Sequence, residues 1–354
     1  MKVTVNYRQI RKNAEAIRRH LPAQTSFCAV LKANAYGHGW RQTALALKGV
    51  ADWFAVARVR EGVRLRSVCS EPVLVLGSCR EHTAQALRCG LTLSVSCAEE
   101  VALVARAAKK IGVTAAVHVQ ADTGMNRFGV KTREELTALC NAADACGIRI
   151  DGVYSHLCST ENAAFTALQR ERFSAFAGIV KQRYPQAIAH LSATSGILLG
   201  KEYAFDMVRA GLALYGYLPI EEDLLQREIL PAKTAEATVI LVKKVRRGET
   251  IGYGNTFVAP NDMTIGLLDV GYADGLPRVL SNAAALPLGE GTYPIVGNVC
   301  MDCTAVDLTC ARAKVGQKIA ILGNNRKSTL HLDDKNPSLC IIIYELLCSL
   351  RETR

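Results

Sequence analysis

Residues 29–39 read AVLKANAYGHG, and the interpretation of the whole chain starts from them. The apolar residues 27–31 are typical of a buried strand, which ends at Lys32 before a polar turn that contains glycines. Burial disfavours the ammonium form of a lysine and lowers its pKa. A neutral amine at such a strand end is a nucleophile that can condense with an aldehyde. Position alone favours a lysine that reaches water with its end group, so the rest of the chain must decide.

Short apolar runs alternate with helical patterns from residue 1 to about residue 220. Amphipathic helices are expected at 98–110 and 133–146, with Asn6 as the N-cap of the first helix. Eight such alternating units predict an α/β fold, a (β/α)8 barrel of the TIM type over residues 1–222, with a doubly wound sheet as the alternative. The eight predicted strands are 27–31, 53–57, 73–77, 91–95, 115–119, 150–154, 188–191 and 207–214.

The pattern changes after residue 222. Alternating or continuous apolar runs at 238–242, 264–268 and 318–322 are separated by glycine and proline turns. They predict a C-terminal all-β domain over residues 223–354, closed by a helical segment at 341–351. The chain of 354 residues is long enough for two such domains.

Composition limits the partners that we expect. The net charge is +11, but the basic residues are spread along helices and aromatic residues make up only 6%, so no nucleic acid is expected. The apolar runs are too short for a membrane span and the first residues lack an apolar signal core, so we expect a cytoplasmic chain without membrane contact. The 13 cysteines are scattered and read as reduced, and no metal site is expected.

Residues 30–39 (VLKANAYGHG) resemble the segment that carries the pyridoxal 5'-phosphate (PLP) lysine in the alanine racemase family. Further segments resemble motifs of the same family, in the same order along the chain. They are 122–129 (DTGMNRFG), 154–156 (YSH), 190–196 (HLSATSG), 206–216 (DMVRAGLALYG), 251–256 (IGYGNT), 271–275 (GYADG) and 300–302 (CMD).

The resemblance implies how PLP is held. Lys32 attaches it, Arg209 faces its pyridine nitrogen, and His190 supports that arginine. Arg127 donates to the ring oxygen, and His156 stacks near the cofactor. The phosphate is assigned to Thr194 with Ser195, to the amides of Gly211 and Leu212, and to the hydroxyls of Tyr36 and Tyr344.

The resemblance also implies a two-base racemisation of an amino-acid substrate in a head-to-tail homodimer with shared active sites. Lys32 serves one face of the substrate, and the partner subunit's Tyr253 serves the other. Arg127 and the amide of Met301 lie near the substrate carboxylate, and Tyr272 gates the entrance. In the family, a carbamylated lysine often orients the arginine; here Gln120 occupies that position, and its neutral amide can still accept a hydrogen bond.

Interconversion of L- and D-alanine as a supply for peptidoglycan is the activity that this resemblance favours. A serine-preferring racemase domain of a glycopeptide-resistance protein is the alternative, and Tyr344 favours alanine. A PLP decarboxylase of basic amino acids is disfavoured, because the chain has no triple glycine and places Arg209 at the pyridine nitrogen. A PLP carrier without turnover is disfavoured by Tyr253.

Overall fold

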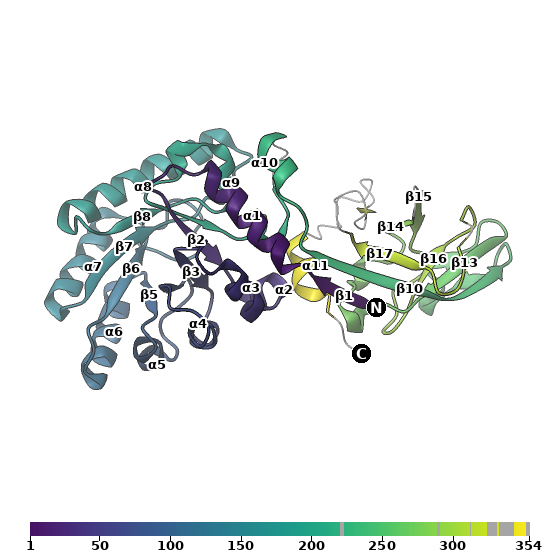
Figure 1. The fold of residues 1–354 in the computed structure, drawn as a ribbon, viewed down its shortest axis with the longest axis horizontal. Helices are drawn as coiled ribbons and strands as arrows, with labels where there is room; N and C mark the ends of the chain where they lie inside the picture. Colours follow the sequence, from purple (N-terminus) through teal and green to yellow (C-terminus); the bar gives the residue numbers. More distant parts are fainter. Residues whose placement is uncertain (220–222, 289–290, 312, 324–330, 333–342, 352–354) are drawn as a thin grey trace. The chain divides into compact units, whose positions relative to one another are not determined.

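The structure is a computed structural model that describes residues 1–219, 223–288, 291–311, 313–323, 331–332 and 343–351 (Figure 1). The chain divides into two compact units. The barrel unit comprises Ile10–Ala35 and Gly39–Ile229, and the C-terminal unit comprises Met1–Gln9, Tyr36–His38 and Leu230–Arg354. The predicted domain boundary at residue 222 lies outside the described residues.

The barrel unit confirms the predicted (β/α)8 architecture. Its eight strands are all parallel and follow the order β8-β7-β6-β5-β4-β3-β2-β9. The last predicted run is only partly a strand, because the strand ends at Ala210 and Leu212–Tyr215 form a 3-10 turn, η2. The strands are β2 (Ser26–Val30), β3 (Trp53–Val56), β4 (Val73–Val75), β5 (Thr92–Val95), β6 (Ala116–Gln120), β7 (Arg149–Tyr154), β8 (Ile188–His190) and β9 (Met207–Ala210).

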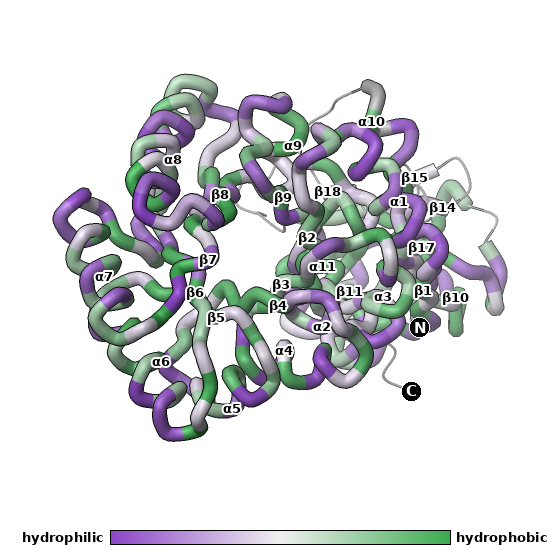
Figure 2. The backbone as a smooth tube through the Cα atoms, turned by 60° about the vertical axis from the view of Figure 1, so that its left-hand side comes forward, coloured by the Kyte–Doolittle hydropathy of each residue, from purple (hydrophilic) through white to green (hydrophobic). Residues whose placement is uncertain are grey.

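Helices surround these strands, and Figure 2 shows α6, α7 and α8 outside them with hydrophilic residues on their outer turns. Side-chain caps start some of them: at α1 (Tyr7–His20), Asn6 Oδ1 accepts a hydrogen bond from the Gln9 amide (3.0 Å), and at α7 (Arg133–Cys146), Thr132 Oγ1 accepts one from the Glu135 amide (3.1 Å). The helices are α1 (Tyr7–His20), α3 (Trp40–Leu47), α4 (Val59–Arg66), α5 (Thr83–Arg88), α6 (Ala98–Ile111), α7 (Arg133–Cys146), α8 (Ala163–Arg183), α9 (Thr194–Leu199) and α10 (Asp223–Glu228), with the 3-10 turn η1 (Lys201–Tyr203).

The C-terminal unit consists mostly of strands, as predicted. Its main sheet is antiparallel and joins β1 (Lys2–Val5), β10 (Lys233–Val245), β13 (Met263–Leu268), β16 (Thr304–Asp307) and β17 (Lys318–Leu322). Strand β1 was not predicted; it pairs with β10, so the start of the chain belongs to this sheet. The remaining elements are β11 (Thr250–Ile251), β12 (Phe257–Val258), β14 (Ala284–Leu288), β15 (Gly291–Pro294), β18 (His331–Leu332), α11 (Ile343–Ser349) and the 3-10 turns η3 (Tyr253–Asn255), η4 (Tyr272–Asp274) and η5 (Arg278–Leu280).

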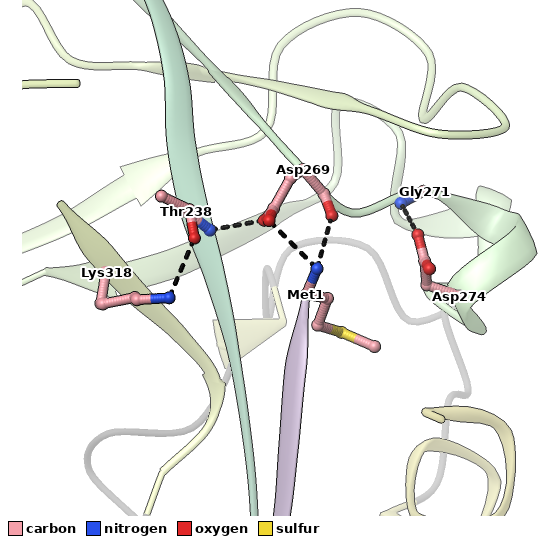
Figure 3. A network of polar contacts seen from close by, with 6 residues as sticks. All are labelled: Met1, Thr238, Asp269, Gly271, Asp274 and Lys318. Atoms are coloured by element: carbon pink, nitrogen blue, oxygen red, sulfur yellow. Dashed lines mark hydrogen bonds and ion pairs between the residues drawn. The ribbon is translucent and has the colours of Figure 1, made fainter. Parts of the chain in front are cut away.

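Asp269, just after β13, ties three strands of this sheet together (Figure 3). Its carboxylate accepts hydrogen bonds from the Thr238 amide of β10 (2.5 Å) and from the Met1 ammonium beside β1 (3.1 Å). Two residues further, the Gly271 amide donates to Asp274 Oδ2 (3.0 Å) and closes the turn that carries Tyr272. The sheet therefore fixes the base of that turn.

Among the described helices, none combines the length and the apolar character that crossing a bilayer requires.

Candidate active site

Lys32 follows β2 and opens a left-handed helical turn, α2 (Lys32–Gly37). Ala33, Asn34, Ala35 and Tyr36 have φ angles of 52°, 54°, 54° and 51°. Such angles cost L-residues roughly 1–2 kcal/mol each, so surrounding contacts must impose this turn. It holds Lys32 at the C-terminal end of a barrel strand, where the chemistry of such barrels lies.

Glu61 of α4 is one of the groups that impose the turn. Its Oε1 accepts a hydrogen bond from the Ala33 amide (2.8 Å), and its Oε2 accepts from the amides of Ala57 (2.9 Å) and Arg58 (3.0 Å). The Tyr215 hydroxyl also donates to the Val30 carbonyl (2.9 Å), two residues before Lys32. Glu61 was not predicted from the sequence, although an acid three residues after an N-cap is a recognisable helix-start signal.

Arg209, on β9, is buried in the barrel, and its two terminal nitrogens make five contacts with described residues, one of them from Nη2 to His156 Nδ1 (3.4 Å). Nη1 donates to His190 Nδ1 (2.8 Å) and to the His190 carbonyl (3.0 Å). Nη2 donates to the carbonyls of Ser155 (2.7 Å) and Leu191 (3.0 Å). In the described part of the chain, the Nε–H of Arg209 has no acceptor, so one donor of a rigidly held cation remains for a ligand.

His118 extends this buried network beyond the predicted residues. His190 Nδ1 must accept from Arg209, so its Nε2 carries the hydrogen that is donated to His118 Nδ1 (2.9 Å). Burial, with Arg209 nearby, lowers the pKa of His190 well below its ordinary value, and burial lowers the pKa of His118 to about 4. The two rings are therefore neutral near pH 7 and leave Arg209 as the cation of the network.

His156 shows that the predicted cations converge. Burial, followed in importance by the positive charges of Arg209, Arg127 and Lys32, lowers its pKa to about 3. These three cations and His156 thus lie in one region at the C-terminal ends of the barrel strands. A site of this kind attracts an anionic ligand.

Arg127 is exposed in the loop after β6, which Asp122 Oδ1 holds by accepting the amides of Gly124 (2.9 Å) and Asn126 (3.0 Å). The hydrogen bond to Gln120 that the sequence allowed is not formed. Gln120 Oε1 lies 3.0 Å from the hydroxyl of Tyr154 instead. Arg127 makes no hydrogen bond with any described residue, so its side chain is available to a ligand.

Four of the six residues assigned to the phosphate belong to the barrel unit and lie where α9 and η2 begin. Thr194 Oγ1 accepts hydrogen bonds from the amides of Ala213 (3.2 Å) and Gly211 (3.4 Å). The Gly211 amide is thus already directed at Thr194, whereas the Leu212 amide has no acceptor among the described residues. Ser195 follows Thr194 in α9.

The donors of the barrel unit fit PLP. Leu212 N–H and the cationic field suit a phosphate, and Arg209 Nε–H suits an acceptor such as an unprotonated pyridine nitrogen.

The other predicted site residues lie in the C-terminal unit. Tyr36 and Tyr344 pack against each other with ring centroids 5.9 Å apart, and burial raises the pKa of both hydroxyls, so they remain donors. Tyr253, Tyr272 and Met301 are exposed, with exposed fractions of 74%, 43% and 54%. Backbone hydrogen bonds link the last two: the Tyr272 amide donates to the Cys300 carbonyl (3.0 Å) and the Ala273 amide to the Met301 carbonyl (3.1 Å).

Comparison with known proteins identifies the family. The sequence profile described as "Alanine racemase, N-terminal domain" matches residues 5–219, and that described as "Alanine racemase, C-terminal domain" matches residues 232–354. The chain belongs to the alanine racemase family. Alanine racemase of Cutibacterium acnes is 35% identical over 96% of this chain and 93% of its own length, and alanine racemase 2 of Bacillus subtilis is 33% identical over 98% and 92%.

Solved alanine racemases have the same fold. The enzyme of Streptomyces lavendulae superposes with a TM-score of 0.89 at 28% identity, over 99% of this chain and 94% of that one. The alanine racemase of Bartonella henselae, solved with covalently bound pyridoxal phosphate, has a TM-score of 0.85 at 28% identity, over 99% and 97%. The PLP in that relative agrees with the donor set that the barrel unit presents here.

Proposed function

We propose that this chain is a PLP-dependent isomerase that interconverts L-alanine and D-alanine. The observation that carries the proposal is the convergence of Lys32, Arg127 and Arg209 on His156 at the ends of the barrel strands. When bound, PLP supplies an electron-withdrawing ring that acidifies the Cα proton of the substrate. All other parts of the reaction are assigned to side chains of this protein.

Side chains and amides of this protein would hold the cofactor. Lys32 would attach it, and Arg209 would donate through Nε to the pyridine nitrogen. Because a guanidinium keeps its proton, Arg209 would leave this nitrogen unprotonated, which would restrain side reactions. Arg127 would donate to the ring oxygen, and His156 would pack beside the ring. The phosphate is bound by Tyr36, Thr194, Ser195, Gly211, Leu212 and Tyr344.

Proton transfer uses two groups on opposite faces of the substrate. The amine of Lys32 removes or returns the Cα proton on one face, and the phenol of the partner subunit's Tyr253 acts on the other. Arg127 orients the substrate carboxylate, with the amide of the partner subunit's Met301, while the partner subunit's Tyr272 lines the entrance.

A head-to-tail homodimer with shared sites is part of this proposal. Its support is the exposure of three large side chains, Tyr253, Tyr272 and Met301, on turns of the C-terminal unit. Tyr272 and Met301 lie on segments joined by backbone hydrogen bonds, and large apolar side chains exposed side by side are typical of interaction surfaces. We further place the enzyme in the cytoplasm, where it supplies D-alanine for peptidoglycan without nucleic-acid or membrane partners.

Borohydride reduction of the purified protein, followed by peptide mapping, tests the cofactor assignment. A pyridoxyl group is expected on Lys32, and a Lys32→Ala variant should carry none. A modified lysine elsewhere would refute the assignment. The ratio of kcat/KM for alanine to that for serine then tests the substrate, and a higher value for serine would overturn the choice of alanine.

A further inference from the structure

Lys233, the first residue of β10, is completely buried in the C-terminal unit. Its Nζ donates to the carbonyl oxygens of Leu350 (2.6 Å), Leu347 (2.7 Å) and Gly37 (3.3 Å). These acceptors use all three hydrogens of an ammonium group. No carboxylate pairs with Lys233 among the described residues, and burial lowers its pKa to about 8. Burying a lysine costs free energy unless its hydrogen bonds offset the loss of hydration.

Leu347 belongs to the last turn of α11, the helix that carries Tyr344, and Leu350 directly follows that helix. The last carbonyls of a helix lack acceptor partners within the helix and carry its partial negative charge. The Arg351 amide, which would bond to Leu347 in a longer helix, donates to the Asp274 carbonyl instead (3.2 Å). Lys233 therefore supplies the donor that the Leu347 carbonyl lacks.

The third acceptor belongs to the residue after Tyr36. Gly37 has a φ of +73°, and a Cβ atom there would lie 2.2 Å from the Leu347 oxygen, so the two backbones approach as closely as glycine allows. The same segment is held by the Tyr7 hydroxyl, which donates to the His38 carbonyl (3.0 Å). Lys233 thus binds the backbone beside Tyr36 and the helix that bears Tyr344 at a single point.

We propose that Lys233 is a positioning residue for the phosphate end of the cofactor. Through the carbonyls of Gly37, Leu347 and Leu350, Lys233 fixes the positions of two hydroxyls, those of Tyr36 and Tyr344, relative to each other. The proposal rests on the proposed function, since the two tyrosines bind phosphate only if the chain takes PLP. Their ring separation of 5.9 Å is the geometry that Lys233 maintains.

Lys233→Met tests this role, because it keeps the length of the side chain and removes every donor. We expect the dissociation constant for PLP, measured by fluorescence titration of the apoprotein, to rise about tenfold or more as the carbonyls lose their partner. Lys243→Met, at an exposed lysine of the same strand, is the matched control and should bind PLP as the unmodified protein does.

A double-mutant cycle separates positioning from general stability. If Lys233 acts through Tyr36, then Tyr36→Phe should weaken PLP binding much less in the Lys233→Met background than in the unmodified chain. The proposal would be overturned if the double variant raised the dissociation constant for PLP by the product of the two single-variant factors. Unchanged PLP binding by Lys233→Met would overturn it as well.

Lys233→Gln, which retains two N–H donors, provides a second variant with an expected intermediate loss. Failure of both variants to fold would also overturn the proposal, since Lys233 would then serve folding alone. Absence of PLP binding by the unmodified chain would refute the proposed function instead.

Discussion

Ala33 shows at the scale of one residue how the turn after Lys32 stores strain. It is exposed, has a φ of 52°, and bonds to Glu61 only through its amide, which any residue can supply. Ala33→Gly should therefore raise the free energy of unfolding by about 1 kcal/mol, because glycine adopts this conformation without a Cβ clash. Urea unfolding monitored by circular dichroism measures the change.

Ala138 provides the matched control. It is also exposed but lies inside the right-handed helix α7, where alanine is the preferred residue. Ala138→Gly should lower the free energy of unfolding by about 1 kcal/mol. Equal destabilisation by the two substitutions would show that the turn at Ala33 is not strained.

Among the elements, the barrel strands carry the buried histidines of the Arg209 network. The folded-state pKa of His118, about 4, lies below its unfolded value of 6.5, so the unfolded chain binds more protons as pH falls below 6.5. The contribution of neutral His118 to the free energy of unfolding is fully present above pH 6.5 and is lost progressively as the pH falls toward 4. Between pH 7 and pH 5, His118 alone should remove on the order of 2 kcal/mol from the free energy of unfolding.

His118→Gln should reduce this pH dependence, because a neutral amide can still accept the hydrogen bond from His190. The surface residue His20, at the end of α1, gives the control substitution His20→Gln. Urea unfolding at pH 5, 6 and 7 compares the three proteins. If the His118→Gln variant loses as much stability as the unmodified protein, His118 is excluded as a source of the acid sensitivity.

The same elements show what sequence can predict. Buried parallel strands are continuous apolar runs, so all eight barrel strands were located, as were the helix Arg133–Cys146 and the N-cap Asn6. Features that depend on distant partners were missed. Residues 33–36 were interpreted only as part of a polar turn, and only contacts such as that from Glu61 show why they turn left-handed.

Long-range pairing also hid the role of two other features. Strand β1 is recognisable only through its partner β10, more than 200 residues away. Lysines are normally expected to be exposed. Nothing in the local sequence predicts that Lys233 is buried and donates hydrogen bonds to three carbonyl oxygens. The site residues of the barrel unit were assigned from motif resemblance, and the structure adds His118 and Glu61 around them.

For the molecule as a whole, the decisive question is which chain supplies the phenol to each site. Two variants, Lys32→Ala and Tyr253→Phe, should each be nearly inactive as pure proteins. When they are coexpressed with different affinity tags, the doubly purified heterodimer contains one site with both groups intact if the sites are shared. Its alanine racemisation rate should then be about half that of the unmodified dimer.

The matched control places both substitutions on one chain and pairs it with an unmodified chain. If the sites are shared, each site of this heterodimer lacks one of the two bases, and it should be nearly inactive although half of its chains are intact. If each barrel used the tyrosine of its own chain, the two heterodimers would exchange behaviour. Racemase assays on the two preparations therefore distinguish the arrangements without any change in composition, because both dimers contain one Lys32, one Tyr253 and one copy of each substitution.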